Sequence, residues 1–248
     1  MASADRRERE RQQTRVRILD AARELFARHG YEDVSLRKVA DAIEYTPAAI
    51  YVHFADKEAL FRELASQDFR ALARQMPVAA RVGEPLVRTA LIGRSYVEFG
   101  LRHPNHYRLM FMTPQTAVCG QNLAPEQKAH FGNPAEDAYA FLCATVAEAI
   151  DKRLVRDELA DVHLAAQTFW AGVHGVTSLQ ITMGTDPWIA WEPTVRRIDA
   201  MIWTLVRGVA RDPSAYPPAD WRTLVAATEA AAPSIAVDVD PSAREGRP

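Results

Sequence analysis

The sequence predicts an all-α protein with a small N-terminal helical unit followed by a larger helical one. Apolar residues recur every three or four positions from residue 14 onward, which is the period of helices packed on one face. Residues that favour helix N-caps stand at the start of several of these patterns. No apolar–polar alternation or hairpin signal indicates a competing strand.

Composition narrows the class of protein. The chain has 248 residues, 48% apolar residues and a net charge of -2, so it can bury a sizeable core and is not basic overall. Any contact with nucleic acid must therefore be local. Cys119 and Cys143 are too few for a disulfide framework or a zinc cluster. Because no long apolar run or signal peptide is present, we expect a cytoplasmic protein with no membrane contact.

The N-terminal region begins with a predicted flexible basic arm over residues 1–13, which are charged and lack apolar periodicity. We expect the first helix to start at Thr14 as its N-cap and to stop at Gly30. A compact domain over 14–61 then follows.

Three further helices are expected in this domain. Ser35 is the predicted N-cap of the second helix, and Thr46 of a third, with Pro47 at its favoured first position. Asp56 caps a fourth, connecting helix over 56–75.

The second and third helices match a helix-turn-helix, in which the third would lie in a DNA major groove. Ile50 and Phe54 are one turn apart and should face the core, which leaves the small residues at the helix start to approach bases. A helical bundle without any DNA role could contain the same pair, and Tyr51 could be half-buried in such a core. The predicted DNA contacts are Thr14, Ser35, Lys38, Thr46, Pro47, Ala48, Tyr51, His53 and Lys57.

Beyond residue 83 only helical patterns appear, in a predicted domain over 83–211. Helices are expected at 85–103, after Pro104, at 135–154, 158–183 and 193–209. A long loop is expected over 113–134. A C-terminal extension over 212–248 is expected to be partly disordered, with one helix near 220–231.

Residues 14–61 resemble the DNA-binding domain of TetR-type (tetracycline-repressor-like) transcriptional regulators. The matching residues are Arg17–Ala22, Leu25–Phe26, Gly30–Tyr31, Val34–Ala40, Ile50–Tyr51, His53–Phe54 and Lys57–Leu60. Two residues depart from the family pattern: Glu44 stands in the turn, where glycine is usual, and Ala48 stands at a small or glycine position. Glu44 must therefore adopt a strained or altered turn, and it places a negative charge near DNA.

This resemblance implies that the remaining helices form a ligand-binding and dimerisation domain. Phe169–Gly175 resembles the tryptophan and histidine-glycine signature of one C-terminal subclass. An aromatic, polarisable lining would suit a mostly apolar organic effector, and plain core packing is the alternative for each residue. The predicted lining is Phe99, Tyr107, Met110, Phe111, Phe141, Trp170 and His174.

A twofold homodimer is expected because one short reading helix makes too few base contacts, whereas two can engage a palindromic double-stranded operator. The helices at 158–183 and 193–209 would form its four-helix interface, with ordinary intrachain packing as the alternative. The predicted interface residues are Thr168, Gly175, Leu179, Ile198, Ile202 and Leu205.

We expect no enzyme, cofactor or metal. Pro104 disrupts the helix that would align His103 and His106, and no HExxH, phosphate loop or serine nucleophile elbow is present. A metal site among His130, Cys119 and Cys143 would need tertiary contacts. The sequence therefore predicts a DNA-binding repressor released by a small molecule. The alternative is a helical small-molecule-binding or protein-interaction module whose DNA binding is weak or lost, which Glu44 would explain.

Overall fold

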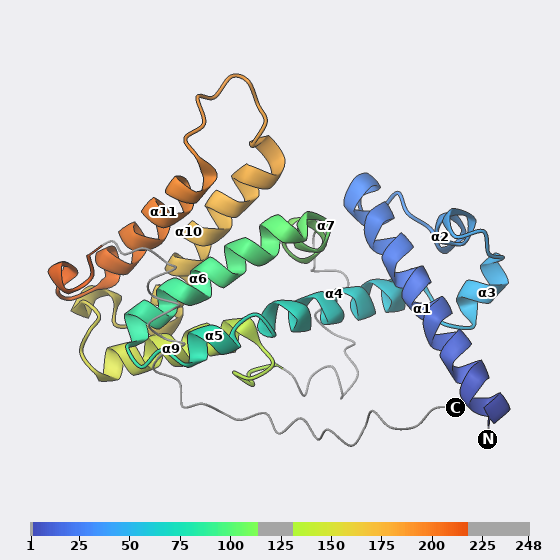
Figure 1. Ribbon diagram of the computed structural model, residues 1–248, viewed down its shortest axis with the longest axis horizontal. Coiled ribbons are helices and arrows are strands. Elements are labelled where there is room, and N and C mark those ends of the chain that lie inside the picture. The colour runs from blue at the N-terminus through green and yellow to red at the C-terminus, as the bar shows by residue number, and fades with distance from the viewer. Residues whose placement is uncertain (1, 114–130, 218–248) are drawn as a thin grey trace, which may run out of the picture. The chain divides into compact units, whose positions relative to one another are not determined.

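The computed structural model describes residues 2–113 and 131–217, and these residues are mainly helical (Figure 1). The N-terminal helices are α1 (Ala2–His29), α2 (Leu36–Ala42), α3 (Pro47–Tyr51) and α4 (Lys57–Ala73). The others are α5 (Pro77–Ala80), α6 (Pro85–Arg102), α7 (Pro104–Tyr107), the π-helix η1 (Arg108–Met112), α9 (Ala138–Asp151), α10 (Val162–Met183) and α11 (Thr194–Val209), with 3-10 turns η2 (Asp157–Leu159) and η3 (Pro213–Ala215). Over these ranges no strand forms, and the all-α prediction is confirmed.

The N-terminal arm differs from its prediction, because α1 is continuous from Ala2 and residues 2–13 are helical rather than flexible. Side chains one turn apart support this extension: Arg6 pairs with Glu10, and Gln12 donates to Glu8 at 2.7 Å. The Arg6–Glu10 ion pair also offsets part of the basic charge of the arm.

Thr14 consequently lies inside α1 instead of capping it. Its hydroxyl donates to the carbonyl of Glu10 at 3.0 Å, which satisfies the side chain within the helix. The prediction of Thr14 as an N-cap is wrong, and its place among the DNA contacts loses that support.

The caps of the next three helices are as predicted. Ser35 accepts the Lys38 N–H at the start of α2, and Asp56 accepts the Ala59 N–H at the start of α4. Thr46 caps α3 in the same way. Each cap satisfies a backbone donor that a helix start leaves free.

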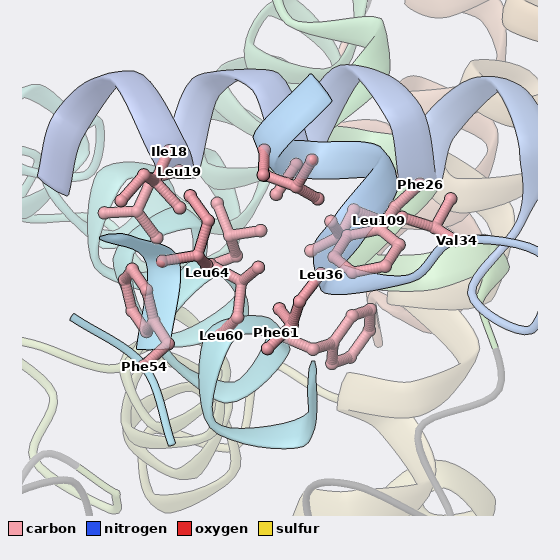
Figure 2. Close-up of a cluster of buried hydrophobic side chains, with 14 of the residues drawn as sticks. Ile18, Leu19, Phe26, Val34, Leu36, Phe54, Leu60, Phe61, Leu64 and Leu109 are labelled. Atoms are coloured by element: carbon pink, nitrogen blue, oxygen red, sulfur yellow. The ribbon is translucent and has the colours of Figure 1, made fainter. Parts of the chain in front are cut away.

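The core of the N-terminal domain includes a residue from the second predicted domain, over 83–211. Phe26 and Phe61 pack edge to face with ring centroids 5.6 Å apart, among buried aliphatic side chains of α1 to α4. Leu109 of η1 enters the same cluster and is 0% exposed (Figure 2). The two predicted domains therefore share apolar packing.

The C-terminal helices pack around α6. It contacts α9, α10 and α11, and α10 and α11 run side by side as an antiparallel pair (Figure 1). Ion pairs tie these helices together: Arg88 of α6 pairs with Glu148 of α9 at 2.5 Å, and Arg94 of α6 pairs with Asp199 of α11 at 3.0 Å. This bundle forms a scaffold for the cavity described below.

Several predicted segments lie outside the described residues. They include 114–130 of the predicted loop, with Cys119 and His130, and residues 218–248 with the helix predicted near 220–231. Pro77 opens the short helix α5, where the first turn tolerates its missing N–H.

Candidate nucleic-acid interface and internal cavity

The predicted reading helix α3 presents one face to solvent. Ile50 is fully buried, whereas Tyr51 and Val52 are 58% and 71% exposed. Thr46, Pro47 and Ala48 at the helix start are also exposed. The outward face therefore combines small residues with one aromatic hydroxyl, and Val52 is an exposed residue that the sequence did not single out.

The turn before α3 contains a strained residue. Glu44 has a φ of 59°, in the left-handed region that costs a residue with a β-carbon about 1–2 kcal/mol. Its side chain is exposed. Glu44 therefore adopts the strained turn expected from the sequence where glycine is absent, and its carboxylate lies close to the start of the reading helix.

Residues of α1 fix the end of α3. The Arg15 guanidinium donates to the His53 carbonyl at 3.0 Å and lies 4.4 Å from the Phe54 ring centroid. Burial, with Arg11 and Arg15 nearby, lowers the pKa of His53. His53 Nδ1 is shielded from solvent and has no hydrogen-bond partner among the described residues. This side chain therefore fits a phosphate contact less well than predicted.

Two lysines predicted to contact DNA are engaged within the domain. The Lys57 ammonium donates to the Tyr31 carbonyl at 2.9 Å and stands 4.2 Å from the Tyr31 ring centroid. The Lys38 ammonium donates to the Asp33 carbonyl at 2.7 Å. Both side chains brace the connection between α1 and α2. Ser35 is exposed beside them, so the backbone at the start of α2 is open to an anion.

A cavity of about 440 Å³ opens among α4, α6, η1, α9 and α10. This size is within the range of small-molecule sites. Its aromatic lining comprises Phe69, Tyr96, Phe111, Phe131, Tyr139, Phe169 and Trp170. Its polar and charged lining comprises Arg62, Ser66, Arg70, Glu136 and Asp137.

Two of the predicted lining residues, Phe111 and Trp170, line this cavity, with ring centroids 5.9 Å apart. Among the described residues, the lining leaves out the other five. Phe99, Tyr107 and Met110 are buried in the core and do not line the cavity. Phe141 is half-buried elsewhere on α9.

His174 joins a hydrogen-bonded cluster beside the cavity instead of lining it. Its Nδ1 lies 2.6 Å from the Tyr107 hydroxyl and 3.1 Å from the hydroxyl of Tyr96, which does line the cavity. Burial lowers the pKa of His174 and raises the pKa of Tyr107 to about 12, so both are neutral near pH 7. The cluster connects the cavity wall to α7.

A buried charge cluster connects the two predicted domains. Asp68 of α4 is 1% exposed. Its carboxylate accepts from Arg23 of α1 at 3.0 Å and lies 2.9 Å from Nδ1 of His106 in α7. Arg23 also pairs with Asp20 at 2.8 Å. Three helices thus meet at one carboxylate, which the sequence patterns did not reveal.

The predicted dimer residues divide between surface and core. Thr168 and Leu179 are exposed on α10, and Gly175 lies half-buried on the same face. Ile198 and Ile202 of α11 are 4% and 0% exposed. These two belong to the core of their own chain, so their assignment to an interface is wrong. Leu205 is half-buried and packs closely against Gly172 of α10.

The chain matches two family models. Residues 18–64 match the model described as "Bacterial regulatory proteins, tetR family", and residues 89–205 match "Tetracyclin repressor-like, C-terminal domain". The protein belongs to the TetR family. The two matches cover the helix-turn-helix and the helices around the cavity of this TetR-family protein. The tryptophan and histidine-glycine subclass stays a prediction.

Curated relatives match over a part of this chain. The regulator UidR of Escherichia coli K12 is 42% identical over 71 residues, which is 28% of this chain and 36% of UidR. The repressor AcnR of Corynebacterium diphtheriae is 34% identical over 93 residues, which is 38% of this chain and 43% of AcnR. The TetR-family chain thus spans less than half the length of these relatives.

Solved structures share the fold over most of the chain. The TetR-family regulator PfmR of Thermus thermophilus superposes with a TM-score of 0.59 at 19% identity, covering 77% of this chain and 97% of PfmR. A TetR-family regulator from Marinobacter aquaeolei gives 0.62 at 21% identity, covering 82% and 98%. These similarities establish the TetR-family fold.

Other kinds of site are not found in the described parts of this TetR-family protein. Within residues 2–113 and 131–217, no three His, Cys, Asp or Glu side chains are grouped to hold a metal ion. None of the helices in those ranges combines the length and apolar character needed to cross a bilayer. His106, weighed above as a metal ligand with His103, instead faces Asp68.

Proposed function

We propose that this protein is a DNA-binding transcriptional repressor that acts as a homodimer and is released from its operator by a small, mostly apolar organic molecule. The observation that carries the proposal is α3, a Thr46-capped helix with an exposed face, in a domain that matches the TetR family. Proteins similar to a part of this chain are named as transcriptional regulators and repressors.

The proposed base contacts come from Thr46, Pro47, Ala48 and Tyr51, which are exposed together at the start and on the outer face of α3. Small side chains permit close approach to base edges, and the Tyr51 hydroxyl can reach a base or a phosphate. Phosphates would be held at the N-termini of α2 and α4, where Ser35 and Lys57 stand. Lys57 would contribute mainly through its backbone N–H.

The proposed dimer uses α10. Leu164, Thr168, Ala171, Gly175 and Leu179 follow one face of this helix at spacings of three and four, and each is exposed or half-buried in the single chain. Such an apolar face is unusual on a protein that acts alone. A second α10 covering it would give a twofold pair that holds two copies of α3 at neighbouring major grooves.

The proposed release couples the cavity to the N-terminal core. Phe69 of α4, Tyr96 of α6 and Phe111 of η1 line the cavity. Two residues before Phe111, Leu109 packs in the core of the DNA-binding domain. A molecule that prefers one arrangement of these helices would shift the spacing of the reading helices, because binding and conformation are linked.

Ala48→Gln tests base readout. The new side chain at the start of α3 should change the preferred base at a position in each half-site, by about 10–100-fold, as expected for one bidentate base contact. The salt dependence should stay the same because no charge changes. Selection from random duplexes followed by mobility-shift titration measures the base preference and the salt dependence. The sites selected by the wild type should be palindromic, with half-site centres about 34 Å apart or a multiple of that distance.

The matched control is Ala80→Gln, the same substitution at an exposed position of α5, which should leave preference and affinity unchanged. A uniform loss across all duplexes with Ala48→Gln would contradict base readout by α3. If the wild type selects no duplex at all, the alternative function holds: a helical small-molecule-binding or protein-interaction module without DNA binding.

Glu44→Gly should strengthen DNA binding and stabilise the fold. Glycine adopts the left-handed conformation of residue 44 without strain. Because glycine also makes the unfolded chain more flexible, which offsets part of this gain, the unfolding free energy should rise by only about 0.5–1 kcal/mol. Removing the carboxylate should raise affinity for all sequences alike. Urea unfolding and mobility-shift titration measure the two effects.

Glu44→Gln separates these effects, because it removes the charge and keeps the β-carbon. It should raise DNA affinity with little change in stability. An affinity unchanged by Glu44→Gln would mean that the carboxylate lies away from the phosphates.

A further inference from the structure

The charged groups of the cavity are not equally free to meet a ligand. Asp137 serves as the N-cap of α9: its Oδ1 accepts the N–H groups of Tyr139 and Ala140, and its Oδ2 accepts the N–H of Gly132 at 3.0 Å. Arg62 is paired with Glu58 at 2.7 Å. Both charges are already balanced or hydrogen-bonded within the protein, and Glu136, the other carboxylate of the lining, also has an interaction partner.

Arg70 differs from them. Its Nε–H donates weakly to the Ser66 carbonyl, at 3.4 Å, one turn back along α4. Within the described ranges no carboxylate lies within ion-pair distance of its guanidinium, although the residue is half-buried and lines the cavity. A guanidinium presents several donors in one plane, a geometry that matches a carboxylate.

The rest of the lining favours an aromatic body. Trp170 lies with its ring centroid 5.9 Å from both Phe111 and Tyr139, and Phe69 lies 5.6 Å from Phe111. These rings come from α4, η1, α9 and α10, so they surround the cavity. Flat rings inserted among them gain offset or edge-to-face contacts as well as burial.

We propose that the effector of this protein is an aromatic carboxylate, with its carboxylate paired to Arg70 and its rings held among Phe111, Tyr139 and Trp170. This inference rests on the proposed effector-binding function and names the chemical class of the ligand. Pairing to Arg70 places the charged end of the ligand on α4, the helix that also carries Asp68.

The test is calorimetric titration of the full chain without DNA. The probes are 2-naphthoate, its neutral analogue 2-naphthamide, and the cation 2-naphthylmethylammonium. We expect 2-naphthoate to bind at least about tenfold more tightly than the amide, from one charge-assisted contact, and the cation to bind most weakly. Arg70→Gln should remove this preference by weakening the carboxylate about 10–100-fold and leaving the amide unchanged.

Arg74→Gln is the matched control: it makes the same change four residues further along the chain, at the exposed C-cap of α4 and outside the cavity lining. It should leave all three affinities unchanged. The proposal is overturned if 2-naphthoate gives no binding heat, if the amide or the cation binds as tightly, or if Arg70→Gln leaves the carboxylate affinity unchanged.

Operator binding is measured separately by mobility shift, so the two proposals can fail independently. Carboxylate binding that depends on Arg70 supports the inference even where no operator is found. Loss of the Arg70 dependence overturns it even where DNA binding is intact.

Discussion

Replacing Asp68 with alanine should lower the free energy of unfolding by about 3–5 kcal/mol, because it removes one partner of a buried charge cluster. The carboxylate is 1% exposed, accepts from Arg23 and lies against His106. Without it, the Arg23 guanidinium stays buried beside Asp20 alone. Urea unfolding followed by far-ultraviolet circular dichroism measures the change.

Glu63→Ala is the control on the same helix. Glu63 pairs with Arg15 at 3.6 Å, and about a quarter of each side chain is exposed (26% and 29%), so its loss should cost at most about 1 kcal/mol. If Asp68→Ala and Glu63→Ala lower the free energy of unfolding by similar amounts, the buried Asp68 cluster stabilises the fold no more than a partly exposed ion pair does. Because the cluster joins α1, α4 and α7, the Asp68 variant should also weaken operator binding.

Leu109→Ala should destabilise the protein by about 2–5 kcal/mol, the range for truncating a fully buried leucine. Leu109 is 0% exposed and packs in the N-terminal core although it comes from η1 (Figure 2). The cavity left behind should loosen the contact between the two predicted domains. We therefore expect differential scanning calorimetry to resolve two transitions where the wild type gives one.

Leu86→Ala provides the comparison, since Leu86 is equally buried, at 1%, but lies on α6. It should cost a similar free energy and keep a single transition. If Leu109→Ala also melts in one step, or costs less than about 1 kcal/mol, the shared core does not hold the two predicted domains together.

Local chemistry explains which parts of the fold the sequence could predict. Ser35, Thr46 and Asp56 cap their helices through bonds to residues three positions away, so a short window contains the whole signal. The extension of α1 to Ala2 escapes prediction because a polar, charged segment is also typical of disorder. Its pairs one turn apart, such as Arg6 with Glu10, are the available signal.

The cavity depends on how distant helices pack, and the sequence could predict only part of it. Phe111 and Trp170 were identified, whereas Tyr96, Tyr139 and Arg70 were missed, because a helical pattern does not tell which apolar face meets a void. Ile198 and Ile202 show the same limit. An apolar stripe looks alike whether its own chain or a second copy covers it.

The left-handed residue in the turn before α3 has an evolutionary consequence. Glutamate codons become glycine codons through one purine transition at the second base, so the substitution at Glu44 is a single step in random mutagenesis. A genetic screen for stronger silencing of a reporter should recover it repeatedly. The strength of silencing, and with it the threshold of the response, can therefore be adjusted at one codon without altering the pocket.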